Sequence, residues 1–437
     1  MPENTRKTVM QMLTSGDEGR VCKDIPESAC HEESGNFLKH ITSLSASKIS
    51  DGLIDPKLVL SWLLTTLGAP AFIIGLLVPV REAGALLPQL FTAAALRKLP
   101  QRKWAWAVGS AVQGLSAACM ALAALTLEGR AAGLAVLGAL AVLAIARSVC
   151  SVTYKDVLGK TVSKSRRGTA TGTASTIGAA AVLTYGGLLS LGLIDRMSIV
   201  TTGLFLAGGL WVAAALLFTT LKEEPGSTEG GGNPIQSFKD NFSLLAEDKQ
   251  LRRFILTRGL LISTALAPPF MVALGTDKDQ AGRMFGGLGL LVIASAGAGL
   301  VSSYVWGRLA DRSSRKVLIL TAAAATIALA ATLGLHLTGL LEQIWALPLV
   351  LFGLMIAYQG VRLGRSTHLV DMASQETRAA YTALSNTIIG GLLVLGGGFS
   401  LVAEYAGNAT VIGLLAVMSA LAIPAAFGLA EVQQDSD

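Results

Sequence analysis

Charged and aromatic side chains are scarce in this sequence. Only 15% of its 437 residues are Asp, Glu, Lys or Arg and only 6% are aromatic, whereas 52% are apolar. The mean hydropathy is +0.57. A soluble domain cannot cover its surface with so few charges while burying so large an apolar fraction. The composition therefore excludes a soluble globular protein and indicates a membrane protein with many spans.

Several functional signatures are also missing. No GxxxxGK[ST] stretch is present, so direct coupling to ATP is not expected. The first 57 residues hold no apolar core of the length that a cleavable signal peptide needs. The four histidines are scattered, and neither a Ser-His-Asp order nor a pair of catalytic carboxylates stands out. We therefore expect neither an enzyme nor a resident cofactor.

Long apolar runs fill most of the chain. A bilayer core of about 30 Å needs about 20 apolar residues per helix, and only helices or closed barrels satisfy their backbone there. Because the runs do not alternate in polarity as barrel strands do, they predict an all-α membrane protein. The twelve predicted spans are 58–80, 82–99, 104–126, 131–154, 168–192, 197–221, 253–275, 281–305, 316–338, 344–364, 379–402 and 407–430.

A linker composition divides these spans into two sets of six. The stretch "EEPGSTEGGGNP" lies at 223–234. The predicted domains are an N-terminal cytoplasmic tail (1–57), a six-helix bundle (58–221), a cytoplasmic linker with a short amphipathic helix (222–252), a second six-helix bundle (253–430) and a C-terminal tail (431–437).

The predicted N-terminal tail contains Cys22, Cys30 and His31. The gap between the two cysteines matches no common zinc spacing, so we favour reduced thiols in a solvated tail over a metal site. The following stretch, "FLKHITSLSASKISDGL", is amphipathic and is expected to lie on the lipid surface.

Basic residues predict the orientation. Short loops on the side of the tail hold 21 Lys and Arg, and the opposite loops hold five. Cytoplasmic loops carry the excess of basic residues, so both termini are expected in the cytoplasm, most simply of a bacterial inner membrane. The pI of about 9.2 then reflects topology, and no basic-aromatic pattern indicates nucleic acid as a partner.

The two sets of spans echo each other. Arg147 precedes Asp156 by nine residues, and Arg362 precedes Asp371 by the same interval. The stretch "TASTIG" at 173–178 is matched by "LSNTIIG" at 384–390, and Pro70 and Gly84 are matched by Pro268 and Gly282. Internally duplicated transporters show such repeats, with a substrate site near the midplane between the halves.

One loop between two predicted spans carries a motif. The stretch "GRLADRSSRK" at 307–316 resembles the loop signature of the major facilitator superfamily, with Ser314 where that family usually has glycine. The resemblance, extended by the twelve spans and the linker, implies two pseudo-symmetric six-helix bundles. It also implies a monomeric secondary transporter that moves a small solute by alternating access, coupled to a proton or another ion.

The resemblance implies a gate at this loop. Gly307 would let two helices approach, and Asp311 would accept hydrogen bonds at the start of the fifth span, near Arg167 and Gly168, when the inner side closes. The gate set is Gly307, Asp311, Arg312 and Arg315. The other interpretation is that these cations only anchor the topology. The matching loop of the first half, "LRKLPQRKW", has no acid.

Polar residues inside the predicted spans are the candidate substrate ligands. Arg147 lies deepest, and an arginine in hydrocarbon costs about 2.5–3.5 kcal/mol unless it faces a cavity or a partner. We predict that it contacts an anionic solute; pairing with Asp156 or Glu82 is the alternative. Tyr358, Gln359, Arg362 and Asn386 would line the same cavity or bind helices together.

Other polar residues have narrower predicted roles. Arg81 and Glu82 are expected at the turn between the first two spans, as an exposed ion pair or, if burial raises the pKa of Glu82, as coupling residues. Arg258 is expected to snorkel to the surface. Pro70, Pro268 and Pro269 are expected to interrupt the first helix of each half. His368 and Met372 share a helix face, but two ligands are too few for copper(I).

A second class of function stays open. The chain could be a non-transporting membrane receptor or assembly factor that acts through its N-terminal tail. A polar cavity meeting Arg147 would favour transport, whereas a dry interface between the halves would favour the receptor.

Overall fold

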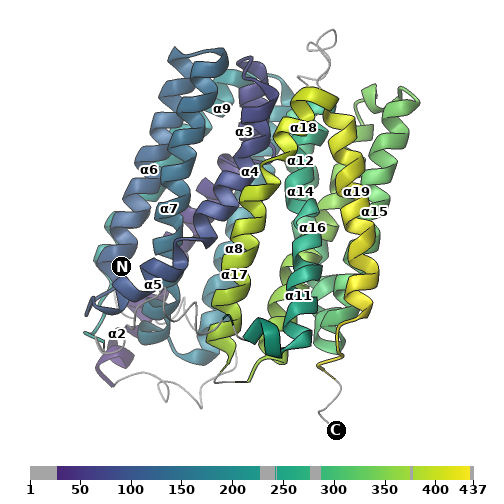
Figure 1. Cartoon of the computed structure of the whole chain (residues 1–437). Helices are drawn as coiled ribbons and strands as arrows, with labels where there is room; N and C mark the ends of the chain where they lie inside the picture. Colours follow the sequence, from purple (N-terminus) through teal and green to yellow (C-terminus); the bar gives the residue numbers. More distant parts are fainter. Residues whose placement is uncertain (1–26, 227–241, 243, 276–286, 375–376, 434–437) are drawn as a thin grey trace.

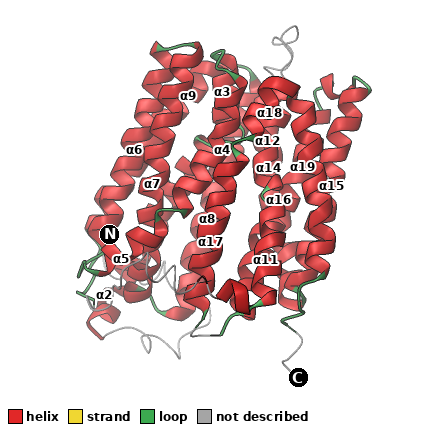
Figure 2. Ribbon diagram, in the orientation of Figure 1, coloured by secondary structure: helices red, strands yellow, loops and turns green. Residues whose placement is uncertain are grey.

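The computed structural model describes residues 27–226, 242, 244–275, 287–374 and 377–433. All regular structure in these ranges is helical, and the helices stand side by side as long rods (Figures 1 and 2). The all-α prediction is confirmed.

The helices before the linker form six rods. The first rod is α2 (Glu27–Leu53) with α3 (Val59–Thr66), and the second is α4 (Ala71–Leu86) with α5 (Gln89–Arg97). The other four are α6 (Lys103–Thr126), α7 (Gly129–Thr161), α8 (Lys164–Leu191) and α9 (Arg196–Thr219).

Six further rods follow the linker. They are α11 (Lys249–Leu260) with α12 (Ser263–Leu274), then α14 (Gly287–Arg312), α15 (Ser314–Leu337), α16 (Ala346–Met372), α17 (Arg378–Gly396) with α18 (Phe399–Ala406), and α19 (Asn408–Phe427). A short 3-10 turn, η1 (Leu340–Glu342), joins α15 to α16. Ten of the predicted spans agree with these rods to within several residues.

Membrane-crossing character is clear for most rods. In the described ranges, nine helices or helix pairs are long and apolar enough to cross a membrane, and α14 contributes a shorter apolar stretch, Gly287–Ser302. The first two rods are not in this set. The spans predicted for this part of the chain, 58–80 and 82–99, do not match these rods.

Residues 27–53 do not belong to a solvated tail. They form α2, which packs against α8 and α9 inside the first bundle. Phe37 is fully buried, and so are the polar side chains of His40, Ser43 and Ser50. Hydropathy did not identify α2 as a span, because many of its side chains are polar. These side chains are tolerated because neighbouring helices enclose much of the surface of α2.

The predicted spans 58–80 and 82–99 were misplaced as a consequence. The chain turns at Gly68, whose φ of +74° is the left-handed region that favours glycine, and Pro70 precedes the first residue of α4. Pro70 therefore marks a turn between the first two rods, whereas Pro268 and Pro269 lie inside α12. The proposed match between Pro70 and Pro268 is thus wrong, and Gly282 lies outside the described residues.

Two other pairs of repeated sequence features lie on corresponding rods of the two halves. Arg147 and Asp156 lie on α7, the fourth rod of the first half, and Arg362 and Asp371 lie on α16, the fourth rod of the second half. The matching stretches 173–178 and 384–390 lie on the fifth rods, α8 and α17.

The start of α2 and the end of α19 lie on one side of the bundle, here called the terminal side (Figure 1). Of the predicted tail motif, Cys22 lies outside the described residues, and Cys30 is disulfide-bonded, contrary to the expected reduced thiol. Most of the predicted linker helix also lies outside the described residues.

Candidate functional site

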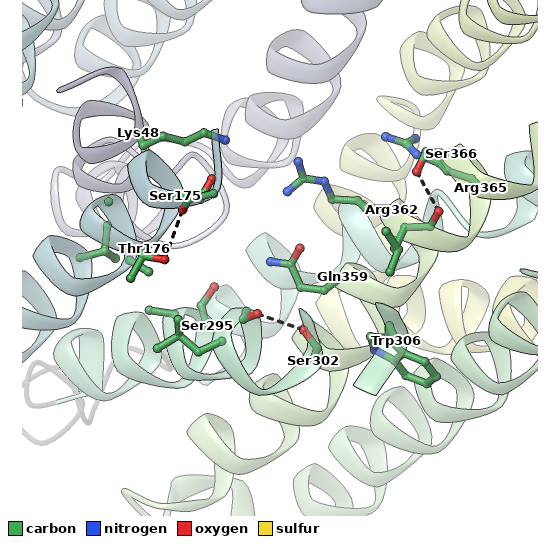
Figure 3. A pocket seen from close by; sticks show the side chains of 18 residues that line it. Lys48, Ser175, Thr176, Ser295, Ser302, Trp306, Gln359, Arg362, Arg365 and Ser366 are labelled. Atoms are coloured by element: carbon green, nitrogen blue, oxygen red, sulfur yellow. Dashed lines mark hydrogen bonds between the residues drawn. The ribbon is translucent and has the colours of Figure 1, made fainter. Parts of the chain in front are cut away.

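A large cavity lies between the two halves. Its volume is about 1160 Å³, and its walls come from α2 and α8 in the first half and from α14 and α16 in the second. Figure 3 shows this cavity with Lys48 on one wall and Gln359 and Arg362 on another. Hydroxyl groups add to the polar lining: Ser175, Thr176, Ser295, Ser302 and Ser366.

Helices α8 and α14, which come from different halves, pack closely on the side opposite the termini and less closely toward the terminal side. At the far end, a Cβ added to Gly186 of α8 would lie 2.9 Å from Cγ1 of Ile293 and 3.2 Å from the carbonyl oxygen of Gly289, both on α14. At the terminal end of the same helices, a Cβ at Gly168 or Gly307 would meet no atom within 4 Å. The cavity therefore lies in the wider part of this wedge.

Three charged residues from three helices cluster in the first half. Asp51 on α2 lies 2.6 Å from Arg147 on α7 and 3.1 Å from Arg81 on α4. Arg147 therefore pairs with an acid that was predicted to lie in the tail, rather than with Asp156 or Glu82. Asp156 instead pairs with Lys160 at 2.7 Å and with Arg102.

Arg81 and Glu82 do not lie at a turn, contrary to the prediction. Both are within α4, because the true turn is at Gly68 and Pro70. Glu82 faces a small enclosed space of about 30 Å³ that it shares with Arg258, Tyr358, Arg362 and Arg365. Within the described residues Glu82 makes no hydrogen bond or ion pair, although the charges of Lys57, Arg81, Arg362 and Arg365 act on it.

Tyr358 and Arg362 lie together on α16. The Lys57 ammonium sits 3.3 Å from the centre of the Tyr358 ring, and the Arg362 guanidinium lies 5.9 Å from it. Such cation-π contacts stabilise a cation by about 0.5–2 kcal/mol. The arrangement brings a cation of the first half against an aromatic ring of the second.

Arg258 is buried rather than snorkelling to the surface. Its guanidinium donates to Oγ of Ser385 at 2.7 Å and to Oδ1 of Asn386 at 2.9 Å, and 6% of the residue is exposed. Asn386 in turn donates to Gln89 of α5 at 3.5 Å, across the two halves. In this state Asn386 contacts Arg258 and Gln89, and Gln359 and Arg362 contribute to the cavity wall.

At the predicted gate, an acid other than Asp311 binds the start of α8. The start of α8 is occupied by Glu33 of α2, which accepts from the backbone N–H of Ser163 and from Arg166, both at 2.8 Å. In the loop itself, Arg315 lies 3.4 Å from Glu431, and Arg312 is exposed. The Asp311 side chain lies outside the described part of the structure.

His368 is buried with its Nδ1 atom 2.9 Å from Oγ of Ser314. Among the described residues no cluster of three or more His, Cys, Asp or Glu side chains could hold a metal ion. His368 thus contributes to packing between α15 and α16.

Four charged residues near the cavity were not predicted from the sequence: Lys48, Asp51, Lys57 and Arg365. Three of them lie within residues 27–57, which were predicted to be part of a tail. The available signal was the amphipathic stretch ending "SASKISDGL", in which Lys48 and Asp51 lie three residues apart, about one helical turn.

Comparisons with solved structures define the fold. The nucleoside transporter NupG matches with a TM-score of 0.66 at 15% identity, covering 90% of this chain and 99% of that one. A POT family transporter in complex with 5-aminolevulinic acid matches with a TM-score of 0.68 at 11% identity, covering 93% and 98%. A D-xylose-proton symporter matches with a TM-score of 0.65 at 12% identity, covering 92% and 99%.

Neither a family model nor a curated protein sequence matches the chain. The structural matches, which extend over about nine tenths of the chain, nevertheless agree on one architecture. The chain is a multi-pass membrane protein with the fold of the major facilitator superfamily, and its structural neighbours are transporters.

Proposed function

We propose that the chain is a secondary transporter that carries a small anionic solute across the bacterial inner membrane by alternating access. The observation that supports this most is the cationic cavity between the halves. Lys48, Arg362 and Arg365 reach it from two different rods. Ionisable groups at membrane depth are costly and mark solute or ion pathways.

The cavity supports transport over the receptor hypothesis, although Arg147 is not among the described residues that line it and is paired with Asp51 instead. A receptor that works through its tail requires neither a polar cavity of about 1160 Å³ nor cations within it. The segment 27–53, which that hypothesis treated as the working tail, is part of the first bundle and supplies Lys48 to the cavity wall.

The excess of basic residues in the loops on the terminal side favours a cytoplasmic location for that side. In this proposal, the wedge described above corresponds to an inward-open state. The opposite state would bring the terminal ends of α8 and α14 together. In that state Asp311 would bind at the start of α8, with Gly307 allowing close approach and Arg312 and Arg315 flanking the contact.

In this proposal, the carboxylates of Asp51 and Glu82, which lie beside the arginines, couple transport to a proton. Asp51 holds Arg147 and Arg81, and Glu82 lies among four cations. Protonation of either acid would release positive charge toward the cavity. This keeps Arg81 and Glu82 as coupling residues and adds Asp51 to them.

The test is a ligand screen followed by transport. The purified protein is heated with members of an anionic, neutral and cationic metabolite library, and stabilising ligands are then assayed for uptake into proteoliposomes. We expect acidic ligands to stabilise the wild type, and R362Q and R147A to weaken that effect.

The matched control is R130Q, because Arg130 is exposed at the start of α7, far from the cavity. Stabilisation and uptake confined to neutral or cationic solutes would overturn the proposal.

A further inference from the structure

Three cations that face the large cavity come from both halves of the molecule. Lys48 projects from α2, and Arg362 and Arg365 project from α16 (Figure 3). The charge of Arg362 acts on Lys48 across the cavity. The cavity is therefore flanked by positive charge on two walls that move relative to each other during alternating access.

These cations lack the carboxylate partners that other charges in the bundle have. Arg81 and Arg147 share Asp51, Arg166 pairs with Glu33, and Arg102 and Lys160 pair with Asp156. Among the described residues, Lys48, Arg362 and Arg365 make no hydrogen bond or ion pair with an acid. Arg362 lies 5.9 Å from the centre of the Tyr358 ring.

The nearby acids do not compensate for this surplus. Both carboxylate oxygens of Asp51 are engaged by arginines. Glu82 interacts at longer range with Arg362 and Arg365 but bonds to neither. The single carboxylate of Glu82 thus acts on several cations, including Arg362 and Arg365. At least two positive charges at the cavity are left for a solute to neutralise.

Resting on the proposed function, we infer that the solute carries two negative charges and binds across the halves, between Lys48 and the Arg362–Arg365 pair. Guanidinium groups bind carboxylates and phosphates through two parallel hydrogen bonds, whereas an ammonium acts as a point charge. The uncharged remainder of the solute would meet the hydroxyls of Ser175, Ser295 and Ser302 and the amide of Gln359, which line the same space.

A dianion can be a dicarboxylate or a phosphate monoester, and two matched ligand pairs distinguish these. Succinate is compared with succinamate, which has one carboxylate replaced by an amide of similar size. Phenyl phosphate is compared with its methyl ester, which has one charge fewer. Binding to the full-length protein is measured by thermal stabilisation and by competition for uptake in proteoliposomes.

We expect at least one dianion to bind about tenfold more tightly than its monoanionic partner. The pair that shows the difference identifies the chemistry. Equal or tighter binding of both monoanions overturns the inference while leaving anion transport intact. Failure of both dianions to bind at millimolar concentration also overturns it. Transport restricted to neutral or cationic solutes would additionally remove the proposed function.

Variants then locate the two charges. K48Q and R362Q should each reduce the dianion preference to about threefold or less, and K48R should retain it because the charge remains. K155Q and R130Q are the controls, since Lys155 and Arg130 are exposed away from the cavity. A dianion preference that persists unchanged in both K48Q and R362Q would overturn the assignment to these residues.

Discussion

Asp51 on α2 lies 2.6 Å from Arg147 on α7, and its other carboxylate oxygen lies 3.1 Å from Arg81 on α4. One carboxylate thus joins three rods of the first half. About a fifth of the Asp51 side chain is exposed, so the cluster is partly solvated. The first rod, which is not apolar enough to be recognised as a span, is held in the bundle partly by this charge pairing.

Replacing Asp51 by Asn should destabilise the protein. Breaking a fully buried ion pair costs about 3–5 kcal/mol, and partial exposure brings the expected loss here to about 2–3 kcal/mol. Thermal unfolding in detergent should show a clearly lower Tm. The control is E404Q, because Glu404 is exposed and near the end of α18. An equal Tm for D51N and wild type would show that Arg147 and Arg81 do not depend on this acid.

The adjacent residues Glu32 and Glu33 offer a second stability test. Glu33 is 1% exposed and binds both Arg166 and the backbone N–H of Ser163. Glu32 pairs with Lys222 through side chains that are 41% and 66% exposed.

We expect E33Q to lower the free energy of unfolding by about 3 kcal/mol or more and E32Q by less than about 1 kcal/mol. Comparing their Tm values tests how α2 is anchored. Similar small shifts in both variants would mean that Glu33 does not fix α2 to the start of α8.

Close packing at Gly186 should control which side of the cavity is open. A leucine there would collide with Ile293 and Gly289 of α14 and oppose closure of the far side. At the next residue, Gly187, an added Cβ meets nothing within 4 Å, so G187L is the matched control.

Thiol labelling measures this effect. A cysteine replacing Ser175 on the cavity wall, in a background without other cysteines, reports access from the terminal side in inside-out vesicles. G186L should reduce labelling several-fold, and G187L should leave it near wild type. Unchanged labelling in G186L would argue against the α8–α14 contact as the outer closure.

Like charges across the cavity should make the empty protein slow to close. Two unit charges about 8 Å apart at an effective dielectric of about 20 repel by about 2 kcal/mol, or about 30-fold in an equilibrium. A bound dianion removes this repulsion. Proteoliposomes loaded with labelled dianion should therefore release it many-fold faster into buffer containing the same dianion than into empty buffer. Equal rates would show that the cations of Lys48 and Arg362 do not oppose closure.

Much of the fold could be predicted because lipid-facing helices must be apolar along their length. The runs that became α6 and α15, for example, were bounded to within a few residues. The echo of Arg147 and Asp156 by Arg362 and Asp371 also placed these residues on equivalent rods. The first rod was missed because hydropathy reports contact with lipid, and α2 is largely enclosed by α7, α8 and α9.

The candidate site was predicted less completely than the fold, because α2 was not recognised as part of the bundle. Gln359 and Arg362 were found as polar residues within an apolar run. Lys48 and Asp51 were not, because their own segment mixes polar and apolar residues and has no long apolar run in which a charge would stand out. An error at the first turn, Gly68 to Pro70, then displaced Arg81 and Glu82 from the interior of α4 to a loop.

The sequence by itself determined the membrane setting, the duplicated architecture and the excess of basic residues on the terminal side, since each depends on composition or spacing along the chain. Tertiary structure alone decided which acid meets Arg147, that a polar segment is the first rod, and that cations from both halves face one cavity. Those relationships depend on distances between segments far apart in sequence, which neither hydropathy nor local spacing encodes.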